Sequence, residues 1–254
     1  RKEAVVSSQI EGTEATLDDL LTFEATPEGT KPGADVEEVC NYLDALVWAR
    51  RELARPKGLP LSMRLVHGVH RRLMRGVRGA SKQPGEVRRS QNWVGGTRPS
   101  NAAYVPPPPE EVPRLLGELE RYIHAEDSLP ALVRAGLVHV QFASIHPYLD
   151  GNGRVGRLLI ALLLEHWKLL GAPLLYLSLH FTRRRPDYYR LLNEVRRSGD
   201  WEGWSKFFLK GVAEIAEESA TTAHDLYRLV TRDRDRVLTA KGSSLTAARL
   251  LEIL

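Results

Sequence analysis

The residues best suited to chemistry lie in one segment of twelve, His146-Pro147-Tyr148-Leu149-Asp150-Gly151-Asn152-Gly153-Arg154-Val155-Gly156-Arg157. The segment combines an imidazole, a carboxylate, three glycines and two guanidinium groups. Glycines on both sides of Asn152 let the backbone turn its N–H groups inward, and a helix that starts here adds the positive end of its dipole. Such a loop followed by a helix binds phosphate.

The charged side chains extend this interpretation to a polyphosphate that carries a metal ion. Arg154 and Arg157 are three positions apart, so on a helix both guanidinium groups project toward the same opening. Two guanidinium groups suit a ligand with several phosphates better than a ligand with a single phosphate. Asp150 supplies hard oxygen ligands for Mg²⁺, and His146 is the strong general-base candidate. Each element alone is common in ordinary structure, but their combination indicates a site.

Most of the remaining sequence predicts helices that position this segment. Apolar residues recur at spacings of three and four over 35–53, where Asp35 and Glu38 match an N-cap and its capping-box partner. Similar patterns predict helices over 16–25, 62–75, 110–125, 130–145, 152–170, 186–197 and 202–220. The expected fold class is therefore mainly α.

One stretch departs from this helical pattern. Short β-prone arms lie on both sides of the turn-rich residues 95–101, and together they predict a β-hairpin near 87–105. The prolines at 106–109 cannot continue a ladder or a helix, so they predict an extended strap into the next helix.

Composition limits the classes of protein to consider. The 254 residues are 43% hydrophobic and 27% charged, which is typical of a globular protein. The longest apolar run, Leu158–Leu164, is far shorter than the roughly 20 residues of a membrane-spanning helix. A single cysteine, Cys40, permits no internal disulfide and favours a reducing, cytoplasmic location. The net charge is +4, and residues 61–90 hold eight basic side chains against one acid, a patch that attracts anions.

The twelve-residue segment resembles the signature of the Fic family, His-Pro-Phe-x-Asp/Glu-Gly-Asn-Gly-Arg-x-x-Arg, and departs from it only at Tyr148. Three further stretches are similar to family features. Ser7–Gly12 matches the inhibitory pattern of the class with an N-terminal inhibitory helix (class II), Pro84–Gly95 resembles the flap region, and Asp187–Trp201 resembles the helices near the nucleotide.

The resemblance implies a Fic-type helical bundle with one hairpin flap. It also implies an organisation into an N-terminal inhibitory region (1–60), a catalytic core (61–220), and a linker with the start of a winged-helix domain (221–254). The implied activity is transfer of AMP from ATP to a Tyr, Ser or Thr hydroxyl of a protein, including the enzyme itself.

The resemblance also implies residue roles. His146 deprotonates the target hydroxyl, and Asp150 binds Mg²⁺. Phosphate oxygens are held by Gly151, Asn152, Gly153, Arg154 and, for the γ-phosphate, Arg157. Tyr188 and Tyr189 are expected near the base or ribose, and ordinary helix packing is an equal alternative for each of them.

Two further segments gain a role in the same way. Flap residues Val94, Gly95, Gly96 and Thr97 are expected to pair with a target segment as an added strand. Ser7 and Glu11 are four positions apart, so on a helix they share a face, and with Gly12 they form the inhibitory segment. Its Glu11 carboxylate would pair with Arg157 and occupy the γ-phosphate position.

Two alternatives stay open at this stage. One keeps the Fic fold but makes removal of AMP, or transfer of another phosphoryl group, the main activity. The other is a DNA-binding regulator, which is motivated by the basic patch and by Ser243–Leu254, where the sequence resembles the start of a winged-helix domain. DNA is expected as a partner only if that domain continues beyond Leu254. A homodimer is also open, and no membrane partner is expected.

Overall fold

Helices form nearly all of the regular structure in the computed structural model, which describes residues 1–27 and 29–239. They are α1 (Lys2–Ile10), α2 (Leu17–Glu24), α3 (Ala34–Ala54), α4 (Met63–Leu73), α5 (Val112–His124), α6 (Ala131–Ile145), α7 (Asn152–His166), α8 (Leu177–Arg183), α9 (Arg185–Ser198) and α10 (Trp201–Thr239), with short 3₁₀ turns η1 (Pro99–Asn101) and η2 (Pro109–Glu111). The mainly α fold is confirmed. Two helices, α1 and α8, are not among those predicted from periodicity.

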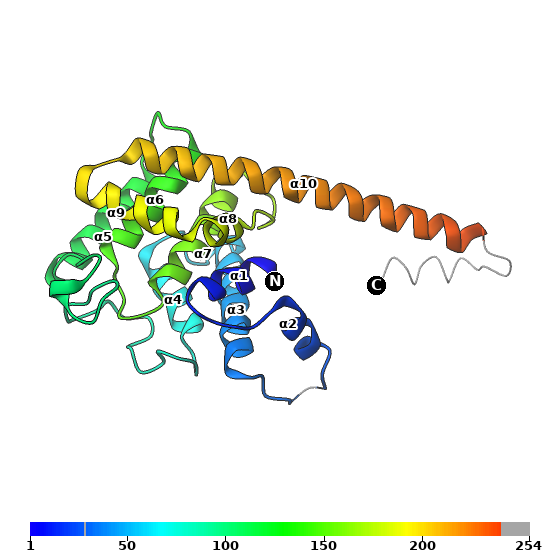
Figure 1. Ribbon diagram of the computed structural model, residues 1–254, viewed down its shortest axis with the longest axis horizontal. Helices are drawn as coiled ribbons and strands as arrows, with labels where there is room; N and C mark the ends of the chain where they lie inside the picture. Colours follow the sequence, from blue (N-terminus) through cyan, green and yellow to red (C-terminus); the bar gives the residue numbers. More distant parts are fainter. Residues whose placement is uncertain (28, 240–254) are drawn as a thin grey trace.

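Helix α7 occupies the centre of the molecule (Figure 1). Its apolar residues Leu158 to Leu164 are buried on nearly every side, as expected for a helix surrounded by others. Helix α6 packs along it, α3 and α4 cover a second side, and α1 contacts it from a third. Helix α10 crosses over α6, α8 and α9, and its Trp204 side chain is buried and donates to the Gly136 carbonyl oxygen at 2.8 Å.

The chemical segment forms the connection between the two central helices. Helix α6 ends at Ile145, and α7 begins at Asn152, so that residues 146–151 make a short loop. His146 and Gly151 at its two ends both have positive φ, of 50° and 75°. Glycine adopts this left-handed conformation without strain, whereas histidine does so at a cost that is typical of functional sites.

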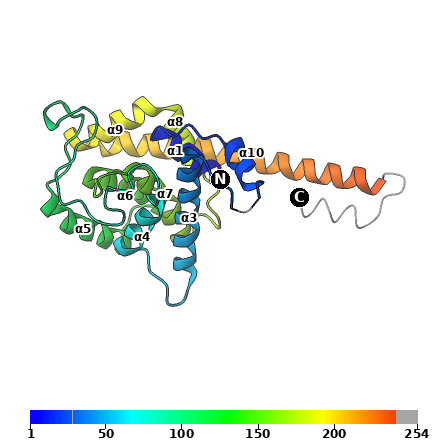
Figure 2. The same cartoon turned by 90° about the horizontal axis from the view of Figure 1, so that it is seen from below.

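Helix α10 is longer than the sequence predicts. It runs unbroken for 39 residues, or about 58 Å at the usual rise, and its C-terminal half extends away from the body of the molecule (Figures 1 and 2). Residues 221–239, expected as a linker, therefore belong to this helix. The predicted start of a winged-helix domain at 243–254 lies outside the described residues.

The predicted hairpin at 87–105 is not formed as a pair of strands. Within 1–27 and 29–239 there is no strand, and this region contains a single antiparallel bridge between Val94 and Tyr104, with N–H···O distances of 2.8 and 3.2 Å. The loop beyond it is closed instead by Asn101, whose side-chain oxygen accepts from two backbone N–H groups at 97 and 98. Prolines at 99 and 106–109 prevent the ladder from extending.

No helix in the described part of the chain is both long enough and apolar enough to cross a membrane.

Candidate active site

The first turn of α7 is an anion-binding element. The helix begins after Gly151 without a side-chain cap, so its first backbone N–H groups have no partner within the helix. Asn152 does not cap them because its side chain closes the loop instead: its Oδ1 accepts from the Tyr148 N–H at 2.9 Å, and its Nδ2 donates to the Tyr148 carbonyl at 2.8 Å. The loop is thereby fixed while the N–H groups stay available to a ligand.

His146 lies at the opposite end of the loop and is held through its own backbone. The Arg88 side chain donates from Nε to the His146 carbonyl oxygen at 2.9 Å, and the Arg88 N–H donates to the Pro147 carbonyl at 2.9 Å. Imidazole Nδ1 lies 3.4 Å from the Ala143 carbonyl oxygen. A carbonyl oxygen requires a donor, so Nδ1 carries the proton and Nε2 is left as the proton acceptor.

The imidazole is neutral at physiological pH. Burial lowers the pKa of His146 to about 4, a hydrogen bond to the Ala143 carbonyl opposes this shift, and the Arg196 and Arg88 guanidinium groups lower the pKa further. A neutral imidazole is the form that accepts a proton.

Asp150 has the properties of a single-carboxylate magnesium ligand. Its Oδ1 accepts from the Gly151 N–H at 2.6 Å and lies 3.9 Å from the Arg154 guanidinium, and its side chain is 40% exposed. The described residues include no cluster of three side chains that could hold a metal ion. Magnesium commonly takes one or two carboxylates and completes its shell with phosphate oxygens and water, so the donor set around Asp150 fits a nucleotide-bound ion.

Arg157 is buried, and the N-terminal segment occupies three of its donors. Its Nε donates to Ser7 Oγ at 2.9 Å, and one terminal nitrogen donates to the Ser7 carbonyl at 2.8 Å and to Glu11 Oε1 at 2.6 Å. Burial by itself would raise the pKa of Glu11, but the charge and hydrogen bond of Arg157, with smaller contributions from the Arg154 and His146 charges, together hold that pKa below its usual value. The predicted pairing of Glu11 with Arg157 is therefore present.

The Glu11 carboxylate also covers the first turn of α7. A methyl group built on Gly153 would approach Glu11 Oε1 to 2.1 Å, so only glycine leaves room for this carboxylate. Glu11 itself follows the end of α1, and Gly12 after it has a φ of 95°, which glycine adopts readily. Ser7, Glu11 and Gly12 are thus brought together with the phosphate-binding element.

Arg154 pairs with Glu38, a residue that the sequence predicted as part of a helix capping box. Its guanidinium, 1% exposed, donates to Glu38 Oε2 at 3.0 Å. The predicted capping box of Asp35 and Glu38 is wrong: α3 starts after Gly33, which has no side chain to cap with, and Asp35 accepts the Glu14 N–H. Tertiary pairing has drawn both carboxylates away from the helix end.

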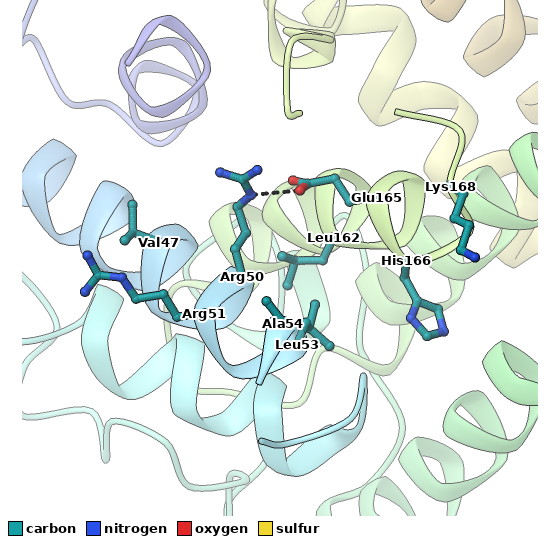
Figure 3. A pocket seen from close by; sticks show the side chains of 9 residues that line it. All are labelled: Val47, Arg50, Arg51, Leu53, Ala54, Leu162, Glu165, His166 and Lys168. Atoms are coloured by element: carbon teal, nitrogen blue, oxygen red, sulfur yellow. Dashed lines mark hydrogen bonds and ion pairs between the residues drawn. The ribbon is translucent and has the colours of Figure 1, made fainter. Parts of the chain in front are cut away.

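The cavity drawn in Figure 3 does not coincide with this site. It has a volume of about 550 Å³ and lies between the far ends of α3 and α7, where Arg50 and Glu165 form an ion pair at 2.8 Å. Apart from Glu165 it is lined by basic and apolar side chains, and it contains none of the predicted site residues.

Comparison with known proteins matches both the region that contains the loop and the N-terminal region to one family. A model of the Fic/DOC family matches residues 60–164, and a model of the Fic/DOC family N-terminal region matches residues 1–51. The two together span more than half of the chain. The chain belongs to the Fic/DOC family.

Curated Fic proteins include homologues of this chain. It is 30% identical over 177 residues to the protein adenylyltransferase Fic of Drosophila grimshawi, covering 69% of this chain and 32% of that protein. With the Drosophila melanogaster protein of the same name the identity is 32% over 167 residues, or 65% of this chain and 29% of that protein. The chain thus spans about a third of the length of these relatives.

Solved Fic structures share the fold. A Fic family protein from Desulfovibrio desulfuricans G20 superposes with a TM-score of 0.72 at 24% identity, covering 100% of this chain and 75% of that one. A fragment of Fic-1 from C. elegans gives a TM-score of 0.64 at 22% identity, covering 86% of this chain and 62% of that one.

The departure from the Fic signature at Tyr148 is accommodated by two histidines that sequence reasoning did not single out. The Tyr148 hydroxyl lies 2.8 Å from His67 Nδ1. His70 stacks on the Tyr148 ring at 3.7 Å, accepts the Gly85 N–H at Nδ1 and lies 3.0 Å from the Asp150 carbonyl at Nε2. Their positions on α4, one turn apart on the buried face, were the available signal.

The two tyrosines of α9 differ in position. Tyr188 is buried, and its hydroxyl lies 2.9 Å from His139 Nε2, so its ring is not open to a nucleotide in this conformation. Tyr189 is 36% exposed and stays a candidate for the nucleotide side of the site.

The predicted flap residues lie apart from the buried part of the site. Gly95, Gly96 and Thr97 form an exposed loop, and the half-buried Val94 supplies the bridge to Tyr104. The loop is joined to His146 through Arg88, whose terminal nitrogens also donate to the Ser90 and Pro107 carbonyls.

Proposed function

We propose that the chain transfers AMP from Mg-ATP to a hydroxyl group of a protein and that its N-terminal segment inhibits this activity. One arrangement carries the proposal: a neutral imidazole and a carboxylate belong to the loop that leads into the uncapped start of a helix, and that helix also bears two buried arginines. A proton acceptor, a metal ligand and a polyphosphate site are the parts that in-line phosphoryl transfer requires.

The chain's own groups divide the reaction as follows. His146 Nε2 takes the proton of the target hydroxyl as its oxygen attacks the α-phosphorus, and the bond to the bridging oxygen breaks to release pyrophosphate. The N–H groups at 152–154 and the side chains of Arg154 and Arg157 hold the phosphates in line. Asp150 holds Mg²⁺, which when bound neutralises charge on the phosphate oxygens. Positioning and charge neutralisation supply most of the catalysis.

Inhibition follows from competition for Arg157. A γ-phosphate needs the donors that Glu11 and Ser7 occupy, and it needs the space over Gly153 that the Glu11 carboxylate fills. ATP that enters past Glu11 must give up this contact, and its α-phosphate is then not held in line with the attacking hydroxyl. The protein should therefore bind nucleotide while transferring AMP slowly.

The loop at 94–97 is the proposed contact for the target. Backbone that is exposed and held by a single bridge can accept an extended segment as an added strand. Recognition of this kind selects an extended segment with a hydroxyl at the correct place rather than a long sequence.

The position of a radioactive label tests the reaction class. The Glu11→Gly protein is incubated with ATP labelled at either the α- or the γ-phosphate, and protein-bound label is measured. We expect protein-bound label from α-labelled ATP and none from γ-labelled ATP. The α-label should be absent when a Glu11→Gly/His146→Ala protein is used instead. Label from the γ-phosphate would support phosphate transfer instead, and absence of both would contradict the proposal.

A further inference from the structure

A buried carboxylate on α3 controls the environment of Arg154. Glu38 is 4% exposed, and its Oε2 accepts both from Arg154 at 3.0 Å and from the Thr13 hydroxyl at 2.9 Å. Its other oxygen lies 3.7 Å from Arg78. A guanidinium buried as deeply as that of Arg154 needs a charged partner, and Glu38 supplies it.

The pairing leaves part of the Arg154 guanidinium free for a ligand. One terminal nitrogen faces Glu38, and the other lies 3.5 Å from Met74 Sδ and 3.9 Å from Asp150 Oδ1. Its Nε is buried without a hydrogen-bond partner. The edge of the Arg154 guanidinium that does not face Glu38 therefore has donors to spare, and it lies near Asp150, the proposed metal ligand.

We propose that Glu38 is a positioning residue for nucleotide binding, which holds Arg154 by one edge so that the other edge donates to the β-phosphate. This inference rests on the proposed function. Without the Glu38 charge, Arg154 would turn to the Asp150 carboxylate, where it would compete with both the phosphate and the metal ion.

A second ion pair between the same two helices provides a matched control. Glu38 and Arg154 lie at the start of α3 and α7, and Arg50 and Glu165 lie near their ends, 2.8 Å apart beside the cavity shown in Figure 3. The spacings of twelve residues on α3 and eleven on α7 correspond to about 18 and 16 Å of helix. The two pairs thus bracket one helix contact, but only the first adjoins the phosphate loop.

The experiment compares the affinities of AMP, ADP and ATP by calorimetric titration in three proteins. They are Glu11→Gly, Glu11→Gly/Glu38→Gln and Glu11→Gly/Glu165→Gln. Because AMP lacks the β-phosphate, Glu38→Gln should weaken ADP and ATP about tenfold and change AMP less than about twofold. Glu165→Gln should leave all three affinities unchanged, although it removes an ion pair from the same helix contact.

Three outcomes would overturn the inference. Equal weakening of all three nucleotides would mean that Glu38 only supports the fold. Unchanged ADP affinity would mean that Glu38 does not position Arg154 for the β-phosphate. Tighter ADP binding would mean that Glu38 competes with phosphate for Arg154. If Glu38→Gln does not fold, Glu38→Asp keeps the charge and should show the same selective loss at smaller size. Failure of the parent Glu11→Gly protein to bind any nucleotide would instead overturn the proposed function and this inference with it.

Discussion

Replacement of Glu11 by glycine should convert a slow enzyme into a fast one. The change removes the carboxylate that lies 2.6 Å from Arg157 and over Gly153, and it frees both the donors and the space that a γ-phosphate needs. Glycine at the end of α1 also loosens the turn that follows Ser7 and its neighbours.

The size of the gain follows from the contact. Arg157 is 1% exposed, and the Glu11 side chain is 31% exposed, so the pair is partly shielded from water. A charge-assisted hydrogen bond of this kind contributes about 1.5–3 kcal/mol, which corresponds to a rate increase of about ten- to a hundredfold. Glu11→Gln keeps a neutral hydrogen bond, so its gain should be smaller.

The assay measures the initial rate of AMP incorporation at saturating Mg-ATP, with mass spectrometry as the readout. Glu24→Gly is the matched control, because Glu24 also ends a helix and also pairs with an arginine, Arg1, at 2.7 Å, but lies outside the site. The control should keep the slow rate of the unmodified protein.

A second comparison separates inhibition from simple loosening. Arg157→Ala also releases Glu11, yet it removes the proposed γ-phosphate donor and should not raise the rate. An equal gain in Arg157→Ala and Glu11→Gly, or no gain in Glu11→Gly, would refute the reasoning that the two side chains compete for one position.

Further predictions concern the base, the metal ligand, the target loop and the docking of α1. With the pKa of His146 lowered to about 4, the rate of the Glu11→Gly protein should hold from pH 8 down to about 5 and fall only below that, whereas a base with an ordinary pKa of about 6.5 would lose most of its rate by pH 5.5. Asp150→Ala should weaken Mg²⁺-dependent ATP binding and transfer together, as followed by Mg²⁺ titration. Val94→Pro removes the N–H that donates to Tyr104 and should lower modification of added proteins by about fivefold with unchanged ATP affinity, so an equal loss of both would indicate misfolding. Burial raises the pKa of Glu3 to about 7, so the stability that its protonated form gives to the docked α1 is complete below pH 4.5 and lost as the pH rises through 7. The basal rate should therefore rise from pH 6 to 8 in the unmodified protein but not in Glu3→Gln.

Sequence patterns predicted the structure correctly where contacts between residues close in the sequence determine it. The segment from His146 to Arg157 fixes its own loop because the two Asn152 hydrogen bonds to Tyr148 close it within four residues. Apolar spacing likewise locates the helices that bury one face. The pairing of Glu11 with Arg157, 146 residues apart, was reached only through the family resemblance.

Sequence patterns could not predict contacts between elements that are far apart in the sequence. Glu38 fits a capping box by spacing, but its actual partner lies on another helix, 116 residues away. Arg88 reads as one member of a basic patch, yet its side chain is buried and supports His146. The hairpin was overestimated because β-prone residues cannot form a ladder where prolines and a side-chain-closed turn interrupt it.

Intact-mass analysis tests the central claim most directly. The Glu11→Gly and Glu11→Gly/His146→Ala proteins are each incubated with Mg-ATP and an added protein mixture. We expect one or more mass increments of a single adenylyl group in the first sample and none in the second. Equal increments in both samples, or no increment in either, would contradict the claim.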